Sequence, residues 1–164
     1  AITADDPTAL LALINTGTPA LPMLGIALHR HLQQLPDLDY GLGLTERLSL
    51  QILEREGPLP TGKVFAALMR HDEPLPYLGD LMFWWLLQPL LAGPTPLLHI
   101  DSSEADWPQR VIQLSPQGQA VMQGKVDGFN CRATGYWVGG VELQPGQPHW
   151  RYDPAQQRLH RHSG

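Results

Sequence analysis

One unbroken apolar run, from Leu81 to Leu87, constrains the fold of this chain more than any other feature. Gly79 and Asp80 precede the run, and Asp80 is suited to cap the first turn of a helix. Pro89 follows it and is expected to kink or end that helix. A helix that is apolar on every side is normally buried on most sides. The side chains that we expect to be nearly fully buried are Leu81, Leu87 and Trp84 or Trp85.

The composition is that of a globular domain with many short elements. Of 164 residues, 43% are apolar and 16% are charged, while 16 Pro and 16 Gly supply frequent turns. This length suits one domain, with or without a small appendage. The net charge of −5 comes from 11 Lys and Arg against 16 Asp and Glu, so the chain as a whole lacks the basic character of nucleic-acid-binding proteins.

Helix signals recur through the first half of the chain. Asp6 and Pro7 are suited to open a first helix, which Gly17 ends. Leucines then recur at spacings of three and four residues from Leu21 to Leu35, which is the pattern of one buried helix face. The helices expected before the apolar run cover residues 6–17, 18–36, 45–56 and 61–69.

Short apolar segments between turn residues predict strands in the second half. The first two of these strands form a hairpin, after which Ser115 and Pro116 are suited to open a short helix through Gln123. Turns at Pro145 and Asp153 join the later strands. The expected strands cover residues 97–100, 109–114, 136–143, 149–152 and 158–160.

Three helices followed by a two-stranded hairpin is the element order of a winged helix. The segment from Leu114 to Met122 is similar to the one that follows the wing in such domains. We therefore expect an α+β fold, with a winged-helix-like helical core followed by a small antiparallel sheet. The parts expected are an N-terminal helical segment (1–40), the winged-helix-like core (41–125) and C-terminal antiparallel strands packed on the core (126–164).

Several short segments, taken in order, resemble a bacterial family. They are Gly43-Leu44-Thr45-Glu46-Arg47, Gly57-Pro58-Leu59, Pro76-Tyr77-Leu78-Gly79-Asp80 with Phe83-Trp84, and Trp137-Val138-Gly139-Gly140-Val141 with Trp150-Arg151-Tyr152-Asp153. They look like the C-terminal half of proteins in the domain-of-unknown-function family numbered 1835, over residues 25–160. The resemblance implies that a further domain precedes this part, and it supplies no established enzymatic activity to expect here. The chain begins with Ala rather than Met, which suggests a processed chain or a fragment of a longer protein, and we favour the fragment.

Few residues have the pattern of a catalytic or metal site. Cys131 lacks the flanking signature of a nucleophile, so we interpret it as an inert thiol. His29 and His31 point to different sides of a helix, so they are unsuited to hold one metal and we expect them to be solvated. His160 and His162 share one face of an expected strand, where we favour a basic tail over a metal site.

Acidic residues and glycines also have plain structural interpretations. Asp101, Glu104 and Asp106 form an acidic hairpin tip, whose spacing matches no calcium motif, and we expect a solvated loop. Gly139 and Gly140 lie inside an expected strand, where glycine is typical of a bulge or a close backbone approach. The five tryptophans are expected in the core or an interface rather than as stacking platforms for bases. We expect no cofactor and no metal.

Two classes of function compete for this sequence. A recognition helix reads base edges with Arg, Lys, Asn or Gln, whereas the third helix of the expected module offers Leu, Met, Phe and Trp, and its one amide is Gln88. The residues named for a weak nucleic-acid contact are Lys63, Arg70 and Arg110. We expect a non-enzymatic structural or protein-interaction module, and the alternative is the DNA-binding domain of a transcriptional regulator.

A protein partner follows from the large apolar content and the few charges, which favour an exposed apolar patch. That partner is either the preceding domain or a second copy of the chain, which would give a homodimer. One cysteine in 164 residues is typical of a reducing compartment, and no signal peptide is visible. The run at 81–91 is too short to span a bilayer. We expect a cytoplasmic protein with no membrane partner.

Overall fold

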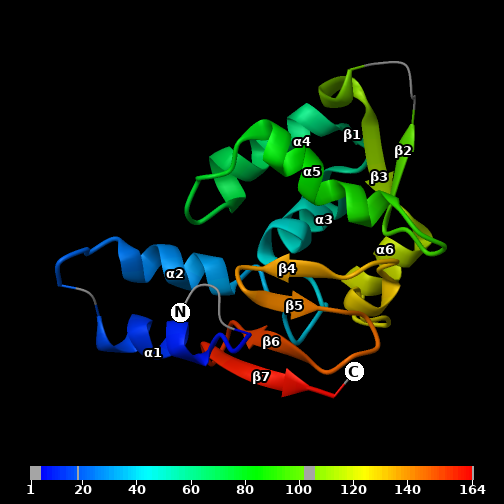
Figure 1. The fold of residues 1–164 in the computed structure, drawn as a ribbon. Coiled ribbons are helices and arrows are strands. Elements are labelled where there is room, and N and C mark those ends of the chain that lie inside the picture. Colours follow the sequence, from blue (N-terminus) through cyan, green and yellow to red (C-terminus); the bar gives the residue numbers. More distant parts are fainter. Residues whose placement is uncertain (1–4, 18, 102–105, 164) are drawn as a thin grey trace. The chain divides into compact units, whose positions relative to one another are not determined.

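The computed structural model describes residues 5–17, 19–101 and 106–163 and shows an α+β fold (Figure 1). The chain divides into two compact units. The continuous unit comprises residues 45–133, and the two-segment unit combines residues 1–44 with 134–164. These boundaries differ from the three expected parts, since the N-terminal helices and the C-terminal strands belong to the same unit.

The continuous unit contains four α-helices and three strands among the described residues. In chain order its elements are α3 (Leu44–Glu56), β1 (Leu59–Pro60), α4 (Thr61–Ala67), the π-helical turn η1 (Leu68–Asp72), α5 (Asp80–Leu91), β2 (Leu98–Asp101), the 3-10 turn η2 (Trp107–Gln109), β3 (Val111–Leu114), α6 (Pro116–Met122) and the 3-10 turn η3 (Phe129–Cys131). Their positions agree with the expected helices and the expected hairpin to within a few residues.

The sheet of the continuous unit is antiparallel and has the strand order β1-β3-β2. Leu59 of β1 pairs with Ile112 of β3, while Leu98 of β2 pairs with Leu114. A helix, a short strand, two helices and a hairpin, with the second hairpin strand at the centre of the sheet, is the arrangement of a winged helix. The expected winged-helix-like order of elements is therefore present in residues 45–133.

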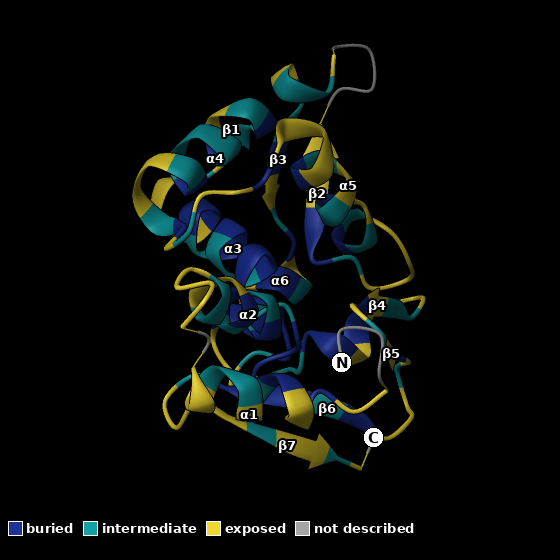
Figure 2. Cartoon of the chain, turned by 60° about the vertical axis from the view of Figure 1, so that its left-hand side comes forward, coloured by how far each residue is buried: buried dark blue, intermediate teal, exposed yellow. Residues whose placement is uncertain are grey.

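Apolar side chains from the helices and the sheet form the core of this unit. Figure 2 colours the buried residues dark blue. Phe83 of α5 and Phe65 of α4 lie with their ring centres 5.2 Å apart, which joins these two helices. Fully buried members include Leu50, Ile52, Val64, Leu68, Phe83, Leu87, Ile112 and Val121. Burial of apolar surface in this core is the main favourable contribution to the folding free energy of the unit.

Ser115 fixes the turn from β3 into α6. Its Oγ accepts a hydrogen bond from the Gly118 N–H at 2.9 Å and donates one to the Pro96 carbonyl at 2.6 Å. Gly118 lies so close to the Leu97 carbonyl that a Cβ at this position would overlap it. The predicted helix start is confirmed, because Ser115 is the N-cap and Pro116 is the first helical residue.

The two-segment unit packs two N-terminal helices with two hairpins. Its elements are α1 (Thr8–Thr16), α2 (Leu24–Leu32), β4 (Tyr136–Val138), β5 (Val141–Leu143), β6 (His149–Asp153) and β7 (Arg158–His162). β4 pairs with β5 and β6 pairs with β7, both antiparallel. The Tyr152 N–H donates to the Pro36 carbonyl at 2.9 Å, and Asp37 forms a parallel bridge with Tyr152, so the two segments are joined by backbone pairing.

Three expected elements have different boundaries in the structure. The strand expected at 136–143 is two strands, because Gly139, with φ of 59°, and Gly140 form a turn rather than a bulge. The helix expected at 18–36 covers only Leu24–Leu32, since Pro22 is incompatible with a helix interior. α5 continues past Pro89 to Leu91. Within the described ranges, no helix has both the length and the apolar character needed to cross a bilayer.

Candidate functional site

Helix α5 has one buried face and one exposed apolar face. Phe83, Leu87 and Leu90 are at most 1% exposed and face the core of the continuous unit. Leu81 is 68% exposed and Trp85 is 64% exposed, and both face solvent. The prediction that Leu81 is buried is therefore wrong, whereas the prediction for Leu87 is confirmed. The prediction that Trp84 or Trp85 is nearly fully buried is also wrong, because Trp84 is half-buried and Trp85 is exposed.

The geometry of the helix explains this division. Residues 83, 87 and 90 recur at spacings of four and three, and residues 81, 85 and 88 repeat the same spacings two positions earlier. Two positions correspond to about 200° of rotation, so the two sets lie on opposite sides of the helix. We call Leu81, Met82, Trp85 and Gln88 the α5 outer face. Trp85 therefore lies outside the core, and the expectation that an all-apolar helix must be buried on most sides fails here.

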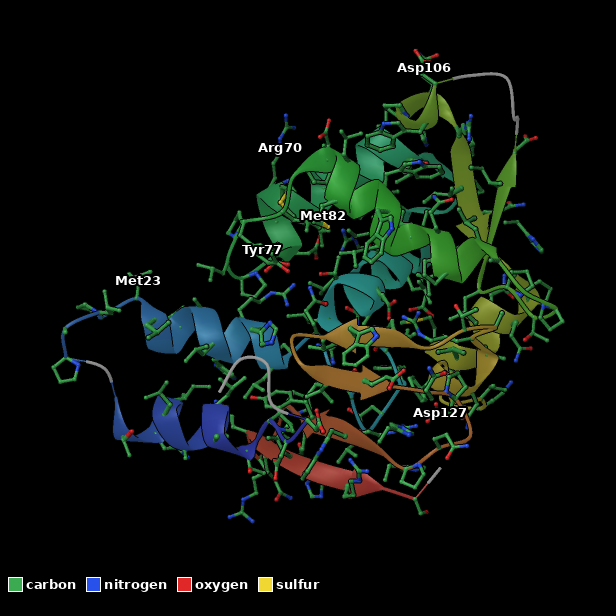
Figure 3. All side chains as sticks on the ribbon, viewed as in Figure 1. Met23, Arg70, Tyr77, Met82, Asp106 and Asp127 are labelled. Carbon is green, nitrogen blue, oxygen red and sulfur yellow. The ribbon has the colours of Figure 1, made fainter. Side chains whose placement is uncertain are left out.

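The start of α5 adds further exposed side chains. Met82 is 54% exposed, and Tyr77, two residues before the N-cap Gly79, is also 54% exposed (Figure 3). The Asp80 carboxylate accepts a hydrogen bond from the Leu81 N–H at 2.7 Å, and an acidic side chain is favourable at this end of a helix. The predicted capping role of Asp80 is wrong, because Gly79 is the N-cap, Asp80 is the first helical residue and no side chain caps this helix. Asp80 thus places one charged group beside the α5 outer face but not within it.

Trp84 lies at the side of α5 and contacts the segment that connects β2 to β3. Its ring stacks on that of Trp107 with a centre-to-centre distance of 5.6 Å, and the Arg110 guanidinium lies 5.9 Å from the centre of the Trp84 ring. Such contacts each contribute roughly 0.5–1.5 kcal/mol. Gly62 of α4 also approaches this region, since a Cβ there would lie 3.1 Å from Pro108. The segment directly before β3 is therefore held against α4 and α5.

The three residues named for nucleic-acid contact lie on different segments. Lys63 is exposed on α4, and Arg70 is exposed on η1, seven residues further along the helical path, or roughly 10 Å. Arg110 is half-buried against Trp84, and its carbonyl accepts a hydrogen bond from the Thr61 N–H at 2.9 Å. Lys63 and Arg110 thus belong to neighbouring segments, while Arg70 is further away. None of the three lies on α5.

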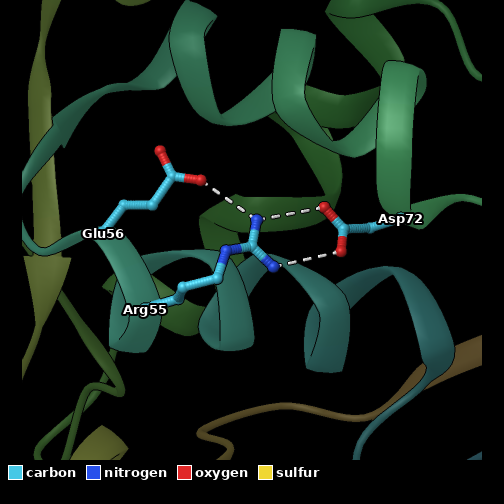
Figure 4. A network of polar contacts seen from close by, with 3 residues as sticks. All are labelled: Arg55, Glu56 and Asp72. Atoms are coloured by element: carbon cyan, nitrogen blue, oxygen red, sulfur yellow. Dashed lines mark hydrogen bonds and ion pairs between the residues drawn. The ribbon is translucent and has the colours of Figure 1, made fainter.

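Arg55, at the end of α3, forms a surface network with two carboxylates (Figure 4). Its guanidinium donates to both oxygens of Asp72 at 3.2 and 3.3 Å and to Glu56 at 3.0 Å. The Asp72 carboxylate is the main cause of a raised Arg55 pKa. This forked pair ties the end of α3 to η1, and the exposed setting limits what it adds to stability.

A buried polar cluster lies in the two-segment unit, on β6. The Arg151 Nε donates to the His149 Nε2 at 3.0 Å, so the His149 Nδ1 carries the proton and donates to the Gln147 carbonyl at 2.8 Å. Arg151 also donates to the Asp37 carbonyl at 3.4 Å. His149 and Arg151 are at most 2% exposed. This burial leaves no room for a substrate, so we interpret the cluster as structural.

His29 and His31 differ from the expectation that both are solvated. The His29 Nε2 lies 2.5 Å from the Tyr152 hydroxyl, which joins α2 to β6. His31 is half-buried, and burial lowers its pKa below the ordinary value of 6.5. Burial likewise raises the pKa of Tyr152. The prediction for these histidines is wrong because the polar side of α2 packs inside the two-segment unit.

The remaining candidates are placed as follows. His160 and His162 lie on β7, where the His160 Nε2 is 3.8 Å from an Asp153 carboxylate oxygen and the His162 ring is 5.0 Å from that of His149. In residues 5–17, 19–101 and 106–163, no group of three or more His, Cys, Asp or Glu is placed to hold a metal ion. Cys131 is buried, and its Sγ accepts a hydrogen bond from Gln117 at 3.3 Å.

Part of the acidic hairpin tip lies outside the described residues. Asp101 and Asp106 are exposed, and Glu104 falls in the segment that the structure does not describe. The two described carboxylates face solvent at the end of the hairpin, in agreement with a solvated loop.

Sequence reasoning missed the α5 outer face and the buried polar pairs. A helix without a polar stripe has no pattern that marks its exposed side, and Gln88, in register with Leu81, is the one polar signal. The buried ion pair between Arg132 and Glu46 joins residues far apart in the sequence, so local patterns do not reveal it.

Comparison with known proteins identified no relative of this chain. No protein-family model, no curated protein and no solved structure matches the chain. The resemblance to the domain-of-unknown-function family 1835 stays a prediction. What the site can do therefore follows from the residues of this chain alone.

Proposed function

We propose that residues 45–133 form a non-enzymatic, winged-helix-like protein-interaction module. One observation carries this proposal: the third helix of the module presents Leu81, Met82 and Trp85 to solvent. In a DNA-binding module, this helix would carry the side chains that read base edges. Exposed Trp, Met and Leu on one helix face are instead typical of protein interfaces, where aromatic and Met side chains are enriched.

The partner that we propose is a second copy of this chain. A face that carries net charge would repel its own copy, but the α5 outer face contains no charged side chain. Two copies of α5 packed antiparallel about a two-fold axis would place Trp85 near the axis, and their opposed helix dipoles would attract each other. The face is thus suited to pack on its own copy, because it is apolar and carries no charge.

The exposed area sets the strength of this contact. Tyr77, Leu81, Met82 and Trp85 each expose between 54% and 68% of their surface. With about 150–250 Å² for each whole residue, they offer roughly 500 Å² per chain. A two-fold contact would then bury roughly 1,000 Å² in total, which is the lower limit for a specific interface. We therefore propose a weak, reversible dimer.

Sedimentation velocity over a range of protein concentrations tests the dimer. The parent chain is expected to shift from monomer toward dimer, and Trp85→Glu is expected to stay monomeric because it places a charge against its own copy. Ile26→Glu is the matched control, since Ile26 is an exposed apolar residue on α2 of the other unit, and it should dimerise like the parent. A strict monomer at the highest concentration, or equal loss in both variants, would contradict the proposal.

DNA binding is the alternative function, and the strand order β1-β3-β2 is the observation that favours it. Charge argues against it. The continuous unit has seven Lys and Arg against ten Asp and Glu, and the exposed Asp101 and Asp106 lie on the hairpin. The Gln88 side-chain amide donates to the Trp84 carbonyl of its own helix at 3.1 Å. α5 therefore offers base edges no cationic side chain, and its one carboxamide already donates to its own helix.

The setting of this function is proposed from the sequence. The single Cys131 is buried as a free thiol, which suits a reducing, cytoplasmic compartment. If the chain is part of a longer bacterial protein, as the family resemblance implies, a preceding domain is the other occupant of the α5 outer face. A monomer that binds a separately expressed preceding domain would favour this occupant over the second copy.

A further inference from the structure

A groove lies beside the sheet of the continuous unit, away from α5. Its volume is about 450 Å³, within the range of ligand sites in proteins. The end of α3 and the turn before β1 form one wall, and the end of β3 and α6 form the other. The residues that carry the argument are Glu54, Pro58, Gln113, Leu114, Gln119 and Gln123.

The backbone at the end of β3 faces this groove. In an antiparallel ladder, alternate residues direct their N–H and C=O groups to the same side. The Arg110 carbonyl accepts from the Thr61 N–H, on the β1 side, whereas the Ser115 N–H donates to Leu97, on the β2 side. Leu114, four residues after Arg110, therefore directs its N–H and C=O toward the β1 side.

Strand β1 is too short to use these two groups. It pairs with β3 only at Ile112 and Val111, and the chain turns away at Pro58 into the end of α3. Among the described residues, no backbone group is bonded to the Leu114 N–H or C=O on this side. The groove thus begins where the ladder stops, and one unused donor and one unused acceptor of the sheet edge lie in its wall.

Polar side chains with unused hydrogen-bonding capacity surround this edge. Gln113, Gln119 and Gln123 are exposed, and each carboxamide has both donors and an acceptor. Gln119 and Gln123 are four residues apart, so they lie on the same side of the α6 turn. Glu54 adds one carboxylate at the opposite wall. Such a set matches the alternating N–H and C=O groups of an extended backbone.

We propose that this groove binds a short extended peptide segment of a partner, which continues the line of β1 along β3. The peptide backbone pairs with Leu114, the carboxamides of Gln119 and Gln123 bind the next peptide groups, and the Glu54 carboxylate selects a basic side chain. Main-chain hydrogen bonds supply affinity in this mode of recognition, and side-chain contacts supply specificity. The site is separate from the α5 outer face.

An NMR titration of the labelled chain with a capped Val-Arg-Val tripeptide tests this site. The expected result is a shift of the Leu114 amide and of the Gln119 and Gln123 side-chain amides, with slower hydrogen exchange at Leu114. The same tripeptide with N-methylated backbone amides cannot donate to a strand edge, and it is expected to produce no such change. Equal responses to the two peptides, or no response at millimolar peptide, would overturn the proposal.

Matched variants separate the groove from general effects. Gln119→Ala with Gln123→Ala removes two hydrogen-bonding side chains and should weaken binding about tenfold. Gln109→Ala, an exposed glutamine of η2 outside the groove, should bind like the parent. Val-Glu-Val should bind more weakly than Val-Arg-Val, and Glu54→Gln should remove this difference. Unchanged affinity in the double variant, with its other amide signals intact, would contradict the assignment.

Discussion

Two oppositely charged side chains are buried together in the continuous unit. Arg132 and Glu46 form an ion pair in the continuous unit, with side chains that are 3% and 8% exposed. Both residues have lost most of their contact with water, so each depends on protein groups for its solvation. Removal of one partner leaves the charge of the other buried and poorly neutralised. Removal of both leaves no buried charge at this position.

The first prediction compares these two changes. Arg132→Met is expected to lower the free energy of unfolding by about 3–5 kcal/mol, because the Glu46 carboxylate stays buried without its partner. Adding Glu46→Leu to this variant should restore much of the loss. Urea unfolding followed by tryptophan fluorescence measures both values. A double variant that is no more stable than Arg132→Met alone would contradict this account.

The second prediction concerns His31 and pH. Burial lowers the His31 pKa in the folded chain below its ordinary value of 6.5. Between these two pKa values the unfolded chain binds more protons, so the free energy of unfolding rises with pH through this window and falls as pH drops below about 6.5. His31→Gln should lose less stability than the parent between about pH 7.5 and 5. Parallel pH profiles of the two proteins would disprove this role.

At the scale of elements, α5 shows that an apolar sequence does not determine which side is buried. Both faces of this helix carry large apolar side chains, and only contact with α4 and the sheet separates them. Core residues and surface residues of the same chemical type therefore coexist within three turns of one helix. Substitutions at core and surface positions of this helix should therefore differ widely in their effect on the free energy of unfolding.

The third prediction uses two leucines of this helix as a matched pair. Leu87→Ala is expected to lower the free energy of unfolding by about 2–5 kcal/mol, since it opens a cavity in the core. Leu81→Ala makes the same chemical change on the exposed face and should stay within about 0.5 kcal/mol of the parent. Thermal or urea unfolding distinguishes them. Similar losses in both variants would show that Leu81 is buried in solution.

Elements with strong local signals were predictable from the sequence, and elements that depend on distant contacts were not. Ser115 and Pro116 mark a helix start through their own chemistry, so the start of α6 is confirmed. Gly139 and Gly140 fit either a bulge or a turn, and pairing between Tyr136 and Leu143 decides for the turn. The α5 outer face belongs to the second kind, because the position of the neighbouring elements selects it.

At the scale of the whole molecule, charge bears most directly on function. The chain has a net charge of −5, and the continuous unit alone has more acidic than basic residues. A DNA-binding module neutralises several phosphates with Lys and Arg, and its affinity falls steeply with salt. The few cations here allow only a weak contact of this kind.

The fourth prediction is that mixed-sequence duplex DNA binds no more tightly than the micromolar range at physiological salt, with a strong loss as salt increases. A titration at two salt concentrations measures this. Lys63→Glu with Arg70→Glu is the informative variant, because both side chains are exposed, whereas Arg110 packs on Trp84. Submicromolar binding that persists at high salt and is lost in this variant would favour a transcriptional regulator.

The division of the chain also sets an order of assembly during synthesis. The continuous unit is complete once residue 133 has left the ribosome, and the Glu46–Arg132 ion pair then holds its two ends together. Helices α1 and α2 are made before the continuous unit, yet their partners on β6 and β7 are made after it. Domains fold as units during synthesis. Helices α1 and α2 therefore wait, with their apolar side chains uncovered, until the continuous unit and the strands after it have been made, and this interval is when a chaperone would find them most accessible.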